Sequence, residues 1–150
     1  MKILHINSYY SAGKFYKSLY DHQIIKGLDI DVYVPVSSSY EPTNFDYGTY
    51  TTISKNHNEY DRYLFHLKHN KIYKDIQDKY NIEEYSLIHA HSLFSNGYIA
   101  MRLKEQYGIP YIVAVRNTDL NLFFKKMIHL RFLGIKILKE AHQIIFLSKS

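Results

Sequence analysis

Two polar segments stand out because each directly follows a short apolar run. His91 to Gly97 follows the run LIHA, and Arg116 to Asn121 follows the run YIVAV. If both runs are parallel strands of one sheet, their carboxyl ends open on the same edge, where open α/β sheets bind ligands. We therefore predict that the two segments line one binding site.

His89 and His91 are two positions apart, so both rings leave the same face of a strand and are candidate metal ligands. The neighbouring sequence offers no third ligand. We favour an interpretation in which His89 packs, hydrogen-bonded, beneath the sheet edge and His91 reaches the cleft. There, His91 would accept a proton from a substrate hydroxyl or donate a hydrogen bond to a sugar. We expect no metal.

Arg116 and Asn117 follow their strand directly. A guanidinium fork and a side-chain amide at that place suit an anionic or polyhydroxyl ligand. The alternative is that Arg116 forms a surface salt bridge and Asn117 is a turn residue.

Two helix starts carry polar groups with two interpretations each. Thr118 and Asp119 are candidate helix N-caps, and Asp119 is also a candidate catalytic carboxylate. Ser95, Asn96 and Gly97 form a turn into the next helix, and their backbone amides could hold an anion.

The apolar pattern predicts strands that alternate with helices. We expect strands at 3–6, 30–36, 49–53, 86–90, 111–115 and 143–147. We expect helices at 14–26, 60–80, 98–107 and 120–141, the last one broken near His129 or Gly134. Gly108 with Pro110 just beyond it marks a helix end. The pattern predicts an α/β fold, a doubly wound and mostly parallel Rossmann-like sheet with helices on both faces, as one domain over 1–150.

Composition narrows the class of protein. A chain of 150 residues that is 46% hydrophobic and 22% charged is a globular domain. No apolar run approaches the ~18 to 20 residues that span a bilayer. Without cysteine there is no disulfide framework and no thiolate metal site, which fits a cytoplasmic chain. The net charge of +5 comes without a nucleic-acid-binding motif, so we expect no nucleic-acid partner.

The glycine pattern argues against dinucleotide binding. The loop after the first strand offers only Gly13, where a dinucleotide fold needs three spaced glycines. The second strand ends at Ser37 without an acidic residue for a ribose hydroxyl, and no P-loop motif is present.

Residues 121–141 form a basic amphipathic segment, which contains five Lys and Arg residues and a single acidic residue, Glu140. Such a segment can pack on the core with a solvated basic face, which we prefer. It can also lie on an anionic membrane surface, with phenylalanines at the headgroup boundary and cations near phosphate. The candidate membrane contacts are Phe123, Phe124, Lys125, Lys126 and Arg131.

Four stretches in order, KILHINSYY, LIHAHSLFSNG, GIPYIVAVRNTDLN and KILKEAHQIIFLSKS, resemble family 4 glycosyltransferases of the GT-B fold. The chain is similar to the N-terminal, acceptor-side domain of these enzymes. In them, two Rossmann-like domains enclose a cleft, and a sugar moves from a nucleotide-sugar to the acceptor with retention of configuration. The resemblance implies a nucleotide-sugar co-substrate, a saccharide or lipid-linked acceptor, and a role in bacterial envelope or capsule polysaccharide synthesis.

By this resemblance, Gly13 lies in the glycine-containing first loop, and His91 and Ser92 lie in the loop after the fourth strand. Together with Asn96, Arg116 and Asn117 they would bind the acceptor, with His91 and Asp119 as catalytic groups. Many family members have more than one glycine in the first loop and a histidine in place of Arg116. An arginine there suits a phosphate-bearing or acidic acceptor. The family also contains members that dock on the inner membrane through a basic segment.

The donor-binding half of such enzymes uses two glutamates eight positions apart, and no pair here has that separation. We therefore expect the C-terminal donor domain to be absent from this chain, which would be inactive alone. The alternative functions are a non-catalytic Rossmann-like binding module and a subunit of a split glycosyltransferase.

Overall fold

The structure, a computed structural model, describes residues 1–147 and contains a six-stranded sheet in the order β3-β2-β1-β4-β5-β6. Every neighbouring pair of strands is parallel. The strands are β1 (Lys2–Ile6), β2 (Asp29–Ser37), β3 (Thr51–His57), β4 (Leu87–Ala90), β5 (Tyr111–Val115) and β6 (Gln143–Phe146). The helices are α1 (Phe15–Ile25), α2 (Phe65–Lys79), α3 (Ser95–Tyr107) and α4 (Arg131–Glu140). The predicted doubly wound, Rossmann-like fold is confirmed.

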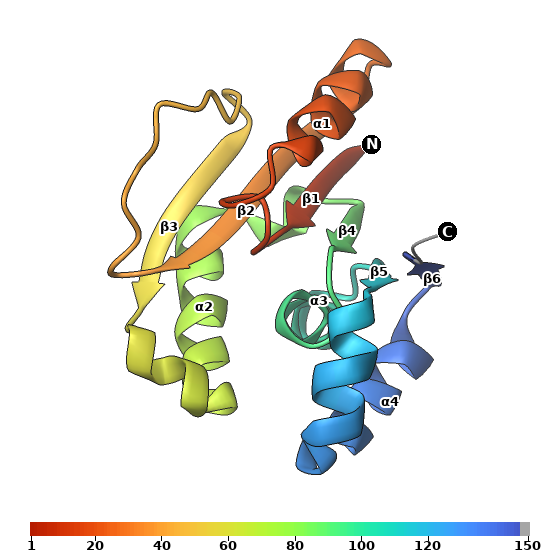
Figure 1. Ribbon diagram of the computed structural model, residues 1–150. Helices are drawn as coiled ribbons and strands as arrows, with labels where there is room; N and C mark the ends of the chain where they lie inside the picture. The colour runs from red at the N-terminus through yellow and green to blue at the C-terminus, as the bar shows by residue number, and fades with distance from the viewer. Residues whose placement is uncertain (148–150) are drawn as a thin grey trace.

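The helices divide unequally between the two faces of the sheet (Figure 1). Side chains of α1 pack with Ile3 of β1 and the apolar residues of β2, whereas α2, α3 and α4 pack on the opposite face with Leu4 and Ile6. Because the central strands are covered on both sides, they read as apolar runs interrupted only by His5 in β1 and His89 in β4. Leu4 and Ile6 are fully buried, and each contributes roughly 1.5–3 kcal/mol through burial.

The strand order reverses between β1 and β4, which lie side by side although 80 residues of chain separate their ends. Such a switch point leaves a crevice at the carboxyl ends of the two strands. The loops after β1, β4 and β5 therefore converge at one edge of the sheet.

The third strand differs from its predicted range of 49–53. It runs from Thr51 to His57, and its second half is polar. Backbone pairing with β2 and side-chain bonds hold it in place, since Ser54 Oγ donates to Asp75 Oδ2 at 2.6 Å. Tertiary contacts outweigh the weak strand propensity of this stretch.

The two long helices expected from the sequence are each divided. The predicted helix at 60–80 becomes a 3-10 turn (η1, Glu59–Tyr63) followed by α2, because the Asp61 carboxylate accepts the Asn58 amide at 2.8 Å and closes a separate turn. The predicted helix at 120–141 becomes a π-helical segment (η3, Asp119–Phe124), a 3-10 turn (η4, Ile128–Leu130) and α4. The break falls at His129, as predicted, and Gly134 lies inside α4. A short 3-10 turn (η2, Ile82–Glu84) precedes β4.

Other predicted boundaries agree closely. Helix α3 ends at Gly108 in the left-handed conformation with φ 74°. Within residues 1–147, no helix is both long enough and apolar enough to cross a membrane.

Candidate functional site

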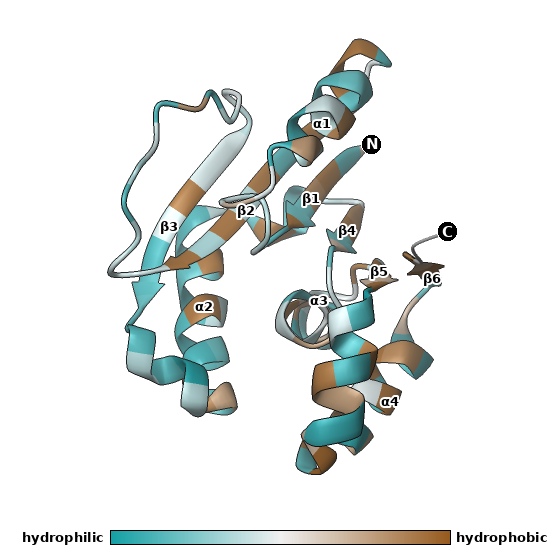
Figure 2. Cartoon of the chain, viewed as in Figure 1, coloured by the Kyte–Doolittle hydropathy of each residue, from teal (hydrophilic) through white to brown (hydrophobic). Residues whose placement is uncertain are grey.

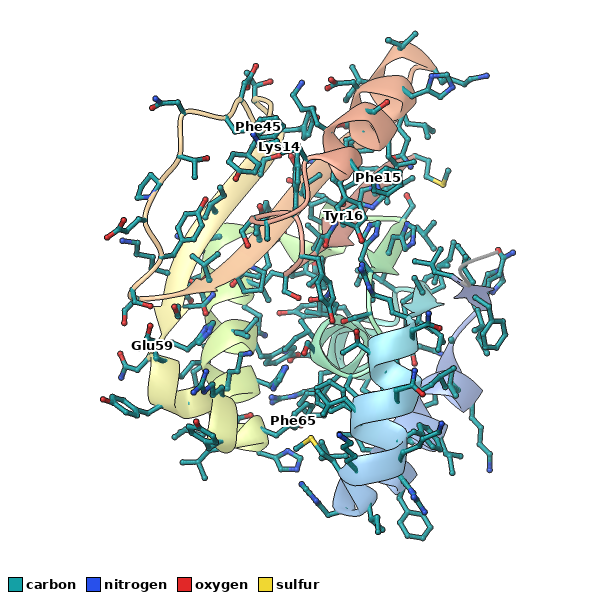
Figure 3. All side chains as sticks on the ribbon, viewed as in Figure 1. Lys14, Phe15, Tyr16, Phe45, Glu59 and Phe65 are labelled. Carbon is teal, nitrogen blue, oxygen red and sulfur yellow. The ribbon has the colours of Figure 1, made fainter. Side chains whose placement is uncertain are left out.

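The loops after β1 and β5 enclose a cavity of about 650 Å³ at the switch-point edge. We call it the Arg116 cavity. Figure 3 labels Phe15 and Tyr16 at the start of α1, where this helix contributes to the cavity. It is lined by Gly13, Phe15, Tyr16, Arg116, Asn117, Thr118 and Leu147. The structure therefore brings together three of the predicted binding residues, Gly13, Arg116 and Asn117.

Two tyrosines hold the Arg116 side chain. Its guanidinium carbon lies 4.0 Å from the centre of the Tyr9 ring, and its Nη1 donates to the Tyr16 hydroxyl. The ion pairs formed within residues 1–147 do not include Arg116. The salt-bridge interpretation is therefore wrong for the described chain, and a positive charge without a carboxylate partner faces the cavity.

Asp119 joins the loops after β4 and β5 and is only 1% exposed. Its Oδ2 accepts hydrogen bonds from the backbone amides of Leu93 at 3.1 Å and Arg116 at 2.8 Å. Burial raises the pKa of this carboxyl, while the amide donors and the Arg116 charge oppose the rise. Neither Thr118 nor Asp119 caps η3 through its side chain, because the Asp119 carboxylate binds amides that precede this helix. Thr118 stands at the N-cap position of η3, as predicted, but it makes no capping bond through its side chain.

His91 lies beneath the edge of the sheet and is 3% exposed. Its Nε2 is 3.0 Å from His5 Nδ1 and 3.2 Å from the Tyr20 hydroxyl. Our expectation that His91 reaches the cleft is wrong, because the rings of Tyr16 and Tyr20 cover it edge-on. Burial lowers the pKa of His91 well below its usual range, so the ring is neutral at pH 7.

The third imidazole of this cluster, His5, was not apparent from the sequence. It lies on β1 in register with His89 of β4, and burial lowers its pKa to about 3. The ligand-capable nitrogens of His5, His89 and His91 all lie within 4.8 Å of one another. Three neutral imidazoles could hold a zinc ion. In the structure, however, His5 and His91 bond to each other and His89 stacks on His91 at 4.1 Å.

A second cavity, of about 320 Å³, lies at the carboxyl ends of β1 and β2, beside α2 and α3. We call it the Lys68 cavity. Residues 7–14, the loop after β1, separate it from the Arg116 cavity, because Ser8 and Ser11 line one and Gly13 lines the other. It is lined by Ser8, Ser11, Pro35, Val36, Ser37, Tyr40, His57, Lys68, Ile72, Ser95, Asn96 and Ile99.

Ser92 and Asn96 arrange the start of α3. The Ser92 hydroxyl accepts the Asn96 amide at 3.2 Å, and the Ser92 carbonyl accepts the Gly97 amide at 2.9 Å. These two amides are therefore satisfied within the chain, which contradicts our expectation that they hold an anion. Asn96 instead offers its side chain, whose Nδ2 is buried and has no hydrogen-bond partner within residues 1–147.

The basic segment, residues 121–141, exposes some of the predicted membrane-contact residues and partly buries others. Phe123 and Phe124 are half-buried and pack against Phe94. That they also contact a membrane stays a prediction. Arg131 donates to the Phe124 carbonyl at 2.5 Å. Lys125 is exposed, as is Lys126. Figure 2 shows hydrophobic and hydrophilic turns alternating along this part of the chain. Its exposed apolar side chains are Leu122, Ile128, Phe132 and Ile135, and Leu120 just before the segment is exposed as well.

Comparison with known proteins identifies the fold. No family model matches the sequence, and no curated protein matches it. Among solved structures, sucrose-phosphate synthase from Thermosynechococcus elongatus is similar, with a TM-score of 0.68 and 14% identity over 99% of this chain and 77% of that chain. Arabidopsis thaliana UGT89C1, solved with UDP, matches with a TM-score of 0.51 and 14% identity over 99% of this chain and 45% of that one. The chain therefore has the fold of one half of a GT-B glycosyltransferase.

Proposed function

We propose that this chain is the acceptor-binding domain of a retaining, family 4-like glycosyltransferase. It would present a saccharide or lipid-linked saccharide to a nucleotide-sugar held by a separate donor domain. The observation that carries the proposal is the Arg116 guanidinium at the switch point of the sheet, which forms no ion pair within residues 1–147. Transfer needs both halves, because only a closed cleft aligns the acceptor hydroxyl with the anomeric carbon.

In this proposal, Arg116 and Asn117 bind oxygens of the acceptor and fix its orientation. Asp119 acts as a positioning residue, since its carboxylate holds the backbone of Arg116 and Leu93. His91 positions the first loop through Tyr20, whose hydroxyl accepts from Asn7 Nδ2 at 2.8 Å. Asp119 would therefore act through Arg116, which binds the acceptor, and His91 would act by holding the loop after β1 in place.

The lipid-linked acceptor class is supported by the exposed face of residues 120–135. Leu122 and Phe132 are exposed there beside Lys125 and Lys126. Apolar side chains with adjacent cations suit a surface rich in anionic lipid. We therefore propose peripheral association with the cytoplasmic face of the membrane, in bacterial surface polysaccharide synthesis.

The second candidate function is a non-catalytic binding module, or the subunit of a split glycosyltransferase. The solvated Arg116 cavity would serve either role, since ligand binding there needs no donor domain.

Titration of ¹⁵N-labelled protein with short oligosaccharides, a lipid-linked saccharide and nucleotide-sugars tests the proposal. We expect acceptors to shift the amides of Arg116 and Asn117, and nucleotide-sugars to leave them unchanged. Arg116→Gln should remove the shifts. Arg102→Gln is the matched control, because Arg102 also lies 4.0 Å above a tyrosine ring but outside both cavities. Nucleotide binding at Gly13 without acceptor binding would contradict the proposal.

A further inference from the structure

We propose that the Lys68 cavity binds an anionic group of the acceptor, a phosphate monoester or a carboxylate, and that Lys68 is the residue that selects it. This inference rests on the proposed acceptor-binding function and names the class of acceptor. The site is distinct from the Arg116 cavity.

The first support is the charge of the cavity wall. Its lining includes Lys68 and no aspartate or glutamate. Lys68 is half-buried, and it forms none of the ion pairs found within residues 1–147. Asp61 is the carboxylate whose charge acts on the pKa of Lys68, but its Oδ2 is already bonded to Lys71 Nζ at 2.7 Å. An anion in the cavity would supply the missing counter-charge.

The pKa shifts of Lys68 and His57 also support an anion site in this cavity. Burial lowers the pKa of Lys68, with the Asp61 charge opposing the change, so the ammonium is poorly solvated. Burial, followed by the Lys68 charge, lowers the pKa of His57 to about 4. At neutral pH His57 is therefore uncharged beside Lys68, and its Nδ1 already lies 2.6 Å from Asn56 Oδ1.

The second support is an unused donor. Asn96 is 1% exposed, and its Oδ1 accepts from the Ser8 amide at 3.4 Å. Its Nδ2 has no partner in the described part of the chain. Buried donors are rarely left unpaired in folded proteins. A ligand oxygen that enters beside Asn96 would pair with this donor after a small side-chain adjustment, and the serine hydroxyls of the wall offer further bonds.

The size of the cavity limits the acceptor. Its volume of about 320 Å³ lies at the lower end of the roughly 300–1,000 Å³ range of small-molecule sites. Val36, Ile72 and Ile99 form an apolar wall against which the carbon face of a ring can pack. The cavity therefore suits one sugar unit that bears the anionic group.

The test is titration of the chain, followed by ¹⁵N NMR, with glucose, glucose 6-phosphate, glucuronic acid and inorganic phosphate. We expect an anionic sugar to shift the amides of Ser37, Lys68 and Asn96 and to bind at least about tenfold more tightly than glucose, the scale of a hydrogen bond to a charged group. The sugar phosphate and the sugar acid are separate arms, so the tighter one identifies the anionic group.

Variants separate charge from folding. Lys68→Gln should weaken binding of the anionic sugar about tenfold, and Lys68→Arg should retain it. Lys74→Gln, at an exposed position of the same helix, should leave binding unchanged. Equal affinity for glucose and its anionic derivatives, or no effect of Lys68→Gln, would overturn the inference but leave the acceptor function intact. Failure of every saccharide to bind either cavity would overturn both.

Discussion

His5 Nδ1 and His91 Nε2 lie 3.0 Å apart in the interior and join β1 to β4 at the point where the strand order reverses. The contact extends in both directions. His5 Nε2 is 2.8 Å from Gln23 Oε1 of α1, and Tyr20 links His91 to Asn7. This buried polar network anchors the loop after β1 that separates the two cavities.

Replacing one partner of the histidine pair should destabilise the fold. In His5→Leu, the buried His91 Nε2 loses a partner, so we expect the free energy of unfolding to fall by about 1–3 kcal/mol. Urea denaturation measures it, with exposed His22→Leu on α1 as the control. The double variant His5→Leu/His91→Leu should lose less than the sum of the single losses, because neither ring is then left unpaired. Additive losses would contradict the pairing.

The buried histidines also predict a pH dependence of stability. Burial lowers the pKa of His5 to about 3 and that of His89 to about 4, against about 6.5 in the unfolded chain. Below pH 6.5 the unfolded chain therefore takes up protons that the folded protein does not. Stability should be complete above pH 7 and fall from pH 6.5 towards 5 by up to about 1.4 kcal/mol per pH unit for each such ring. A flat profile over that interval would contradict the prediction, because it would show that the folded and unfolded states take up protons equally.

The sequence predicts the fold well where the pattern is local. Gly108 ends α3 as expected, because a left-handed terminal residue is a property of one position and its neighbours. The polar second half of β3 was missed, since its strand conformation comes from pairing with β2. His5 and Lys68 were missed for a related reason. Strand pairing brings His5 to its site, and helix packing brings Lys68 to its own. The sequence next to each residue carries no signal of either contact.

Zinc should not bind the cluster of His5, His89 and His91 strongly. Two of the three rings already bond to each other, and a metal would have to break that bond to reach both nitrogens. We expect the melting temperature to be unchanged when Zn²⁺ is added at micromolar concentration. A ligand that binds only the folded state raises stability by RT ln(1 + [L]/Kd). A rise in melting temperature that His89→Gln abolishes would therefore establish a metal site.

Asp119 is predicted to hold the Arg116 loop. Asp119→Ala leaves the backbone amides of Leu93 and Arg116 without their acceptor, so we expect a loss of about 1–3 kcal/mol in unfolding free energy. Acceptor-induced NMR shifts at Arg116 should also weaken, which simple destabilisation would not cause under folding conditions. Asp78→Ala, on the exposed side of α2, is the control and should change neither quantity.

Membrane association should depend on the basic face of residues 120–135. Each Lys or Arg close to an anionic bilayer contributes about 1 kcal/mol, so reversing Lys125 and Lys126 to glutamate should lower the binding constant at least about tenfold. Sedimentation with vesicles of phosphatidylglycerol and phosphatidylcholine measures it. The charge-matched control is Lys55→Glu/Lys74→Glu, because both lysines are exposed on β3 and α2. If both double variants lose binding equally, the attraction comes from net charge, and residues 120–135 are not a docking face. Loss confined to the first variant, together with weaker binding of Phe132→Ser, would place the apolar and basic side chains of this face at the lipid surface.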